Sequence, residues 1–467
     1  MNMNKTKLRA FLLTIAALLF AKPLYVDEVL KFTVLTTGEP LKDLVRAEYR
    51  LSENSETQHI RAYVKNAGRA SFRIYAKDVA YVKIMPPAGK RLTAVKVIGK
   101  TKAALDIPEK YIFSPFPIQG KKHFDFKFFV IFGSFAYMLF YTLLNKQPFF
   151  DLSVPKIRNV EFLRLIFTFT IVLHHLTPQF EFFTKGYYGV EFFFVLSGLF
   201  LMLTFKPEKT TEGFVKSKIV HFIPLIVLCA LFNCKLVLLP ANMLFLQGTG
   251  LTPAVPAQGW YLGVLFWVTL LYFCILKYFK PEPGKMLIAV LTFWALTDND
   301  IGHGLQRGFA GIGLGCFLAI FWNWMRQKTY IPTRANTVAY TCAEAGLLIY
   351  SPVLLFSQAL LPENKVNIYI AYAGLILLFL LKRGKVSQFF EKPFFAKISC
   401  CAFAIYMTHI DLTRAAYYHL LERAPNVFDD YKIALIAVNL VWCYLFGLMI
   451  WKYVELPAAR WLKSKLQ

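Results

Sequence analysis

The sequence has few acidic residues, and its one long hydrophilic stretch contains no cysteine. Only 28 Asp and Glu residues stand against 53 Lys and Arg, and charged residues make up 17% of the 467 positions. Because residues 27–123 lack cysteine, they do not rely on disulfide bonds even if they are exported. No Cys-x-x-Cys pair and no His/Cys cluster has the spacing of metal ligands, so the sequence predicts no metal site.

Long apolar runs account for most of the remaining chain. Hydrophobic residues make up 57% of the whole sequence, which includes 46 Phe, and its mean hydropathy is +0.46. This composition predicts a polytopic α-helical membrane protein in a lipid bilayer. The net charge of +25 would also suit a nucleic-acid partner, but no basic stripe accompanies a recognisable nucleic-acid motif. Basic loops that face anionic lipid explain the charge better, and we expect no nucleic acid partner.

The N-terminal quarter of the chain divides into two parts. Residues 1–26 begin with basic residues and continue into an apolar run from Phe11 to Phe20, which is typical of a signal peptide or a signal anchor. Residues 27–123 show two-residue alternation, as at 60–64 and 72–76, with turn signals between the runs. We predict a small extracytoplasmic β-sandwich there. Its excess of basic residues suits either a spacer near lipid headgroups or a module that holds an acidic glycan.

Eleven apolar segments follow. The first belongs to a linking region, residues 124–155, which we expect to hold one transmembrane helix and a cytoplasmic loop. The other ten form a predicted ten-helix membrane domain over residues 156–467, although 285–298 is short for a straight span. The segments lie at 126–145, 159–177, 187–205, 219–239, 259–279, 285–298, 306–325, 337–356, 366–382, 397–418 and 432–455.

Loop charge predicts the orientation of these helices. Alternate loops are rich in Lys and Arg, whereas the short loops between them carry only Lys185, Lys365 and Arg423. By the positive-inside rule the basic loops are cytoplasmic. We therefore expect residues 27–123 outside and the C-terminus inside.

Three ionisable residues fall within two neighbouring helices. Arg164 and His175 are eleven residues apart on one helix, which separates them by roughly 16 Å. The next helix re-enters the membrane and carries Glu191 at a depth similar to that of His175. Intramembrane charges are costly and indicate function, and a carboxylate beside an imidazole raises its basicity as in a general base. The alternative is that the His and Glu side chains only hydrogen-bond to each other and have no role in chemistry.

Several short motifs, in this order along the chain, resemble the acyltransferase-3 family of membrane O-acyltransferases. They are Arg-x10-His at 164–175, Gly-Val-Glu-Phe-Phe-Phe-Val-Leu-Ser-Gly-Leu at 189–199, Gly-Trp-Tyr-Leu-Gly-Val-Leu-Phe-Trp at 259–267, Arg307-Gly308, Ile-Tyr-Met-Thr-His at 405–409 and Glu455-Leu456-Pro457. The resemblance covers about residues 156–465. It implies a ten-helix core, acyl-CoA as cytoplasmic donor, with acetyl-CoA the first expectation, and an acceptor hydroxyl outside. His175 would then be the base, with Glu191 and Arg164 beside it.

The donor would need cations on the inner face, and we assign Arg164, Lys216 and Lys218 to it, as lysine offers a point charge but no bidentate fork. Lys206 and Lys209 are interpreted as ordinary positive-inside residues. The chain lacks the arginine pairs that many relatives carry before the third core helix.

The outer face offers three candidate substrate-binding residues. Arg307 would hold a carbonyl oxygen or an acidic acceptor, Trp260 would stack on a sugar, and His409 would line the same cavity. Each also has a purely structural interpretation. Arg307 would extend its side chain to the lipid headgroups, Trp260 would belong to the aromatic belt at the membrane interface, and His409 would form its hydrogen bonds within the protein. The polar residues Asp298, Asp300 and His303 are interpreted as a solvated loop, with a metal site as the lesser alternative.

With this resemblance, we expect an O-acetyltransferase in the inner (plasma) membrane of a bacterium that transfers an acyl group from acyl-CoA to an extracytoplasmic polysaccharide or glycolipid. The main alternative is a transporter or flippase in which Arg164, His175 and Glu191 relay protons or bind substrate. No inverted repeat and no paired Gly/Pro-interrupted helices are evident, which weighs against transport. A third alternative is a glycan-binding or assembly protein whose membrane core is inert.

Overall fold

The computed structural model describes sixteen stretches of the chain, and every structural statement below concerns them. They are residues 5–21, 26–37, 44–51, 56–64, 68–75, 78–98, 104–105, 111–113, 118–119, 121–145, 157–176, 185–233, 235–297, 304–356, 366–415 and 430–466. The chain forms two compact units, one of Met1–Lys146 with Asp411–Trp442 and one of Gln147–Ile410 with Cys443–Gln467.

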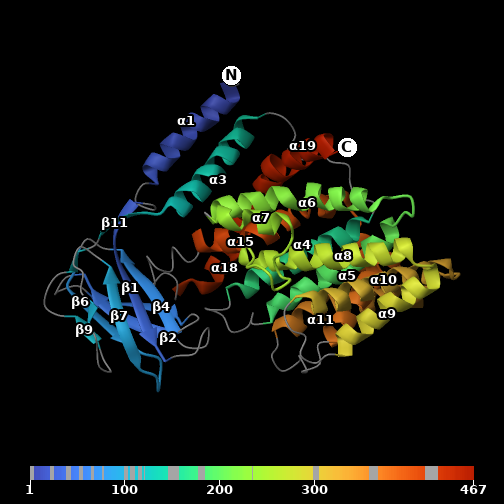
Figure 1. Cartoon of the computed structure of the whole chain (residues 1–467), viewed down its shortest axis with the longest axis horizontal. Helices are drawn as coiled ribbons and strands as arrows, with labels where there is room; N and C mark the ends of the chain where they lie inside the picture. The colour runs from blue at the N-terminus through green and yellow to red at the C-terminus, as the bar shows by residue number, and fades with distance from the viewer. Residues whose placement is uncertain are drawn as a thin grey trace. The chain divides into compact units, whose positions relative to one another are not determined.

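The first unit contains the N-terminal β region, drawn in blue in Figure 1. One sheet has the order β11-β1-β7-β8, with β4 also paired to β1, a second has the order β3-β2-β6-β9, and β10 and β5 form a third. All of these pairings are antiparallel. The strands are β1 (Val26–Thr36), β2 (Leu44–Arg50), β3 (Gln58–Tyr63), β4 (Arg69–Tyr75), β5 (Asp78–Val79), β6 (Tyr81–Met85), β7 (Leu92–Ile98), β8 (Ala104–Leu105), β9 (Tyr111–Phe113), β10 (Ile118–Gln119) and β11 (Lys121–Phe124).

Alternation along the strands builds the core of this region. Leu30, Phe32 and Val34 of β1 are fully buried, and they join one apolar cluster with side chains of β2 and β6 in the other sheet. Successive side chains of a strand point to opposite faces, so every second residue reaches this core. The predicted N-terminal β region is confirmed, whereas its description as a sandwich stays a prediction.

Two helices flank the β region in the sequence and lie side by side in Figure 1, α1 (Lys5–Phe20) and α3 (Phe126–Leu144). Asp125 caps α3, since its side chain accepts a hydrogen bond from the Phe128 amide at 3.0 Å. In the same unit Lys127 of α3 forms an ion pair with the buried carboxylate of Asp411.

The second unit is helical. Its main elements, two of which continue into the first unit, are α4 (Arg158–His174), η4 (Gly186–Tyr188), α5 (Gly189–Thr204), α6 (Thr211–Phe232), η5 (Leu236–Leu238), α7 (Leu239–Met243), η6 (Ala257–Gly259), α8 (Trp260–Tyr278), α9 (Pro281–Thr297), α10 (Leu305–Gln327), α11 (Arg334–Phe356), α12 (Val366–Leu381), α13 (Lys385–Phe389), α14 (Pro393–Ile398), α15 (Ala402–Thr413), α18 (Lys432–Ile450), η8 (Trp451–Glu455) and α19 (Leu456–Leu466).

The prediction of a mostly helical, multi-pass membrane protein is confirmed. Across the described stretches, seven helical segments are long and apolar enough to cross a membrane. Helices α4, α9 and α12 have 17, 17 and 16 residues, slightly short of a full span. A helix is present at 281–297, where the sequence pattern was weakest, but the predicted count of ten spans stays a prediction.

Glycines bring α5 and α10 into direct backbone contact. A Cβ atom on Gly198 would lie 1.8 Å from the carbonyl oxygen of Ile312, and one on Gly315 would lie 1.9 Å from that of Val195. Small residues at a helix interface permit such close approach inside a membrane. This contact fixes α5 against α10, and each helix carries one charged residue of the candidate site.

We predict that Gly198→Ala destabilises the protein, because the added methyl group must push α5 away from α10. Overpacking of this kind costs about 1–3 kcal/mol. Gly346→Ala is the matched control, because a Cβ atom there meets nothing within 4 Å. Thermal unfolding of the detergent-solubilised protein should show a lower melting temperature for Gly198→Ala alone; equal melting temperatures would contradict the close contact.

Candidate active site

A buried ion pair joins α5 and α10. Nε of Arg307 donates to Oε1 of Glu191 at 2.6 Å, and Nη2 donates to Oε2 at 2.8 Å. The two side chains are only 5% and 2% exposed. A bidentate pair with this geometry is among the strongest side-chain interactions, and it offsets much of the cost of burying two charges.

Aromatic side chains enclose this ion pair. The Arg307 guanidinium lies 4.8 Å from the ring centre of Trp260 and 5.6 Å from that of Tyr187. Its Nη2 also donates to the Tyr187 carbonyl at 3.4 Å, and the Tyr369 hydroxyl donates to the Arg307 carbonyl. These contacts tie η4, α8 and α12 to the same arginine. Trp260 is thus a cation–π partner of Arg307 rather than an isolated aromatic-belt residue.

Three histidines gather at the C-terminal end of α4. The ring centre of His175 lies 5.0 Å from that of His174 and 4.9 Å from that of His409 on α15. His174 also contacts Tyr187, at 5.4 Å between ring centres. The helices therefore bring His175 and His409 together, although the two are far apart in the sequence.

The carboxylate of Glu191 has a partner that the sequence did not suggest. We expected Glu191 to orient His175 and Arg307 to bind the substrate, whereas the structure bonds both Glu191 oxygens to Arg307. The available signal was that an arginine opening a membrane helix needs a buried anion. The pairing itself depends on the packing of α5 against α10, which the sequence did not disclose.

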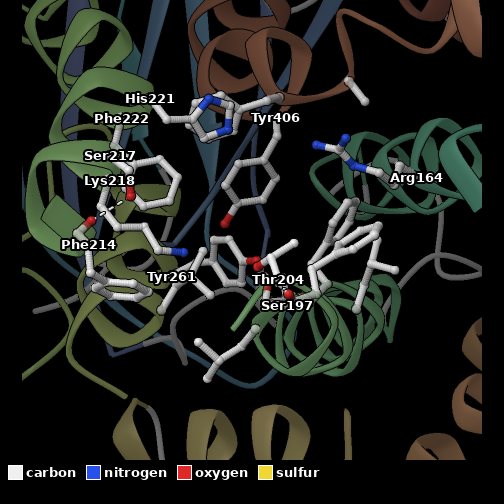
Figure 2. A pocket seen from close by; sticks show the side chains of 18 of the residues that line it. Arg164, Ser197, Thr204, Phe214, Ser217, Lys218, His221, Phe222, Tyr261 and Tyr406 are labelled. Atoms are coloured by element: carbon white, nitrogen blue, oxygen red, sulfur yellow. Dashed lines mark hydrogen bonds between the residues drawn. The ribbon is translucent and has the colours of Figure 1, made fainter. Parts of the chain in front are cut away.

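A cavity of about 370 Å³ lies beside Arg164 of α4, and α5 lines it from Val190 to Thr204. The first half of α6 and the N-terminal parts of α8 and α15 complete its wall. Figure 2 shows Lys218 and Arg164 reaching into it from opposite sides, with Tyr261, Tyr406 and Ser197 between them. The lining residues are Arg164, Val190, Phe193, Leu196, Ser197, Phe200, Leu201, Thr204, Lys209, Phe214, Ser217, Lys218, His221, Phe222, Tyr261, Leu265, Ala402, Phe403 and Tyr406.

The cations of this cavity differ in part from the predicted set. Arg164 and Lys218 line it as expected, but Lys209 takes the place predicted for Lys216. Nζ of Lys209 donates to the Ser217 hydroxyl at 3.3 Å, and Lys216 instead forms an exposed ion pair with Glu212 at 2.7 Å. Lys218 lies on the face of α6 that lines the cavity, whereas Lys216 does not.

Carboxylates accompany Arg164 in the helical unit. Nη1 of Arg164 donates to Glu161 on the same helix at 2.6 Å. Glu455 of η8 is buried and interacts electrostatically with Arg164, and its Oε2 atom has no hydrogen-bond partner in the described part of the chain. Arg164 therefore carries a charge that is already partly compensated before any ligand binds.

The described residues hold no group of three or more His, Cys, Asp and Glu side chains placed to bind a metal ion. Asp298, Asp300 and His303 lie outside the described residues. The absence of a metal site stays a prediction.

The family profile described as an acyltransferase domain, acyltransferase-3, matches residues 157–451. The chain belongs to the acyltransferase-3 family. The match includes α4, the α5–α10 ion pair, the cavity and His409, so each candidate site residue lies within the acyltransferase domain. No curated protein and no solved structure gives a significant match to the chain.

In this acyltransferase we predict that removing one partner of the ion pair is worse than removing both. Arg307→Met leaves a buried carboxylate without its partner, which costs about 3–5 kcal/mol, and Glu191→Leu leaves a buried guanidinium. The double variant Glu191→Leu/Arg307→Met leaves neither charge. Folded yield and melting temperature should therefore be higher for the double variant than for either single one. Additive losses would show that the two charges do not depend on one another.

Proposed function

We propose that this membrane acyltransferase transfers an acyl group, acetyl in the first instance, from cytoplasmic acyl-CoA to a hydroxyl of an extracytoplasmic polysaccharide or glycolipid. The observation that carries the proposal is the layout of α4 within the acyltransferase domain. Arg164, in the first half of this helix, lines a cationic cavity, and the C-terminal end of the helix holds the histidine cluster. The eleven residues between Arg164 and His175 span roughly 16 Å, comparable with an extended pantetheine arm.

The cavity suits the phosphate-rich end of the donor. Lys209, Lys218 and Arg164 supply positive charge, and the aromatic and aliphatic lining suits the less polar arm. Its volume of about 370 Å³ lies at the lower end of the usual range for ligand pockets. Because Lys209 and Lys218 belong to a basic loop and the helix after it, the positive-inside rule places this end in the cytoplasm.

The histidine cluster suits the acceptor. His175 would take the proton of the acceptor hydroxyl while the oxygen attacks the thioester carbonyl. The carbon–sulfur bond then breaks, and the thiolate of the leaving CoA receives that proton from His175. Trp260 lies beside Arg307 and would give a sugar ring a stacking surface. Glu191 would act by holding the Arg307 guanidinium in place.

The proposed orientation determines on which side of the membrane the other parts of the chain lie. With the cavity inside, residues 27–123 lie outside, the C-terminus lies in the cytoplasm, and the protein resides in the plasma membrane of a bacterium. The acceptor then meets the β region and the histidine cluster from the same side of the bilayer.

We predict that His175→Ala abolishes transfer of label from radioactive acetyl-CoA to envelope glycan added to the purified protein. The neighbouring His174→Ala is the matched control and should retain most of the activity, because His175 is the proposed base. Labelling that survives in His175→Ala would overturn the mechanism. Transport of a solute into vesicles, with no thioester turnover for any acceptor, would favour the transporter alternative.

We predict a separate effect on donor binding. Lys218→Ala and Lys209→Ala should each raise the KM for acetyl-CoA about tenfold, because each removes a charge-assisted contact worth about 1.5–3 kcal/mol before screening. The kcat should change little. Lys216→Ala is the control, since Lys216 is paired with Glu212 outside the cavity lining. A larger KM for Lys216→Ala than for Lys218→Ala would show that the donor binds elsewhere.

A further inference from the structure

The backbone of α15 fixes the tautomer of His409. Nδ1 of this fully buried histidine lies 2.7 Å from the carbonyl oxygen of Tyr406 and 3.3 Å from that of Ile405. A carbonyl oxygen only accepts hydrogen bonds, so the hydrogen of the neutral ring must be on Nδ1. Nε2 therefore carries a lone pair and is a hydrogen-bond acceptor.

This acceptor is unused in the described part of the chain. Nε2 of His409 is buried and has no hydrogen-bond partner there. A buried polar atom without a partner is uncommon in a folded protein and calls for an explanation. The sequence left open a histidine whose hydrogen bonds are all made within the protein. That description fits Nδ1 but not Nε2.

The helical turn that carries His409 is held in place by neighbouring helices. Gln258 donates from its side-chain amide to the Met407 carbonyl at 2.6 Å, and the Tyr406 hydroxyl donates to the Gln258 carbonyl at 2.8 Å. The thiol of Cys229 approaches the Met407 carbonyl as well, at 3.3 Å. His409 thus has a fixed tautomer on a fixed turn, and a positioning group needs both properties.

The ring of His175, the proposed base, lies next to the ring of His409. The ring centres of His175 and His409 lie 4.9 Å apart, with 34° between the ring planes. An N–H···N hydrogen bond between two imidazoles requires a centre-to-centre separation of roughly 5 Å. His175 directly follows the last residue of α4, and the proposed bond requires its ring to turn toward Nε2 of His409.

We propose that His409 is the positioning residue of the acyl-transfer centre, and that its Nε2 atom accepts a hydrogen bond from the His175 ring. His175 then presents its other nitrogen to the acceptor hydroxyl. When that nitrogen takes the hydroxyl proton, the imidazolium still donates to His409, and it later gives the proton to the departing thiolate. His409 stays neutral throughout. The proposal rests on the proposed function, because it assigns His175 as the base.

The kinetic test compares three variants of the full-length protein with labelled acetyl-CoA and the envelope glycan. His409→Phe removes the acceptor atom and should lower kcat between about 10- and 100-fold, less than the 10²–10⁴ that a general base itself contributes. The KM for acetyl-CoA should not change. His409→Gln supplies a side-chain oxygen as acceptor and should recover part of kcat. Thr408→Val, a buried neighbour on the same helix, controls for packing and should leave kcat near the original value.

Full activity in His409→Phe, or equal losses in the Phe and Gln variants, would overturn the positioning role. A merely structural role predicts equal losses, together with a lower melting temperature for each variant. If His175→Ala retains activity, the proposed function fails first, whatever the His409 variants do. The two failures are therefore distinguishable in one set of assays.

A second measurement needs no acceptor. The protein labelled with ¹⁵N-histidine should show His409 as the Nδ1–H tautomer, and His409→Phe should change the ring-nitrogen signals assigned to His175 by comparison with His175→Ala. Unchanged His175 signals, or an Nε2–H tautomer at His409, would contradict the proposed hydrogen bond.

Discussion

The buried ion pair between Glu191 and Arg307 is the interaction on which the rest of the helical unit depends. Two charges in an apolar interior are tolerated only when the geometry is good and the remaining donors are used. The Gly198 and Gly315 contacts bring α5 and α10 close enough for that geometry, and the bidentate bond then fixes how the two helices meet. Because Tyr187, Trp260 and Tyr369 all contact Arg307, the pair also sets the positions of η4, α8 and α12. The close backbone contact and the charge pair therefore support each other.

Helix α4 separates two chemical environments by its own length. At one end Arg164 faces a cavity with Lys209 and Lys218, where positive charge is concentrated. At its C-terminal end His175 lies against His409, with 4.9 Å between the ring centres. In the proposed reaction this division would hold the charged part of the donor at the cavity and the acceptor hydroxyl at the histidines.

The sequence predicted the parts of this arrangement that depend on pattern. Alternation in residues 27–123 indicated strands, apolar runs indicated membrane helices, and the spacing of Arg164 and His175 placed them at opposite ends of one helix. It did not predict the partner of Glu191 or the exchange of Lys216 for Lys209. Both depend on the rotation of helices about their axes, and helices that are apolar all round carry little periodicity to reveal that rotation. The fixed tautomer of His409 likewise depends on a backbone contact that no residue pattern encodes.

In the proposed arrangement a backbone carbonyl orients the histidine pair, where many enzymes use a carboxylate, and the same electrostatic limit favours this choice. A carboxylate that oriented His175 would add a buried negative charge, and the charge of Glu191 is already balanced by Arg307. The Tyr406 carbonyl fixes His409 without adding any charge, and His409 can then orient His175 as a neutral group. In the proposed transfer two charges form, the imidazolium of His175 and the developing negative charge on the thioester oxygen. In an apolar environment these two charges attract each other strongly, so a neutral support for His175 favours the transition state over the resting state.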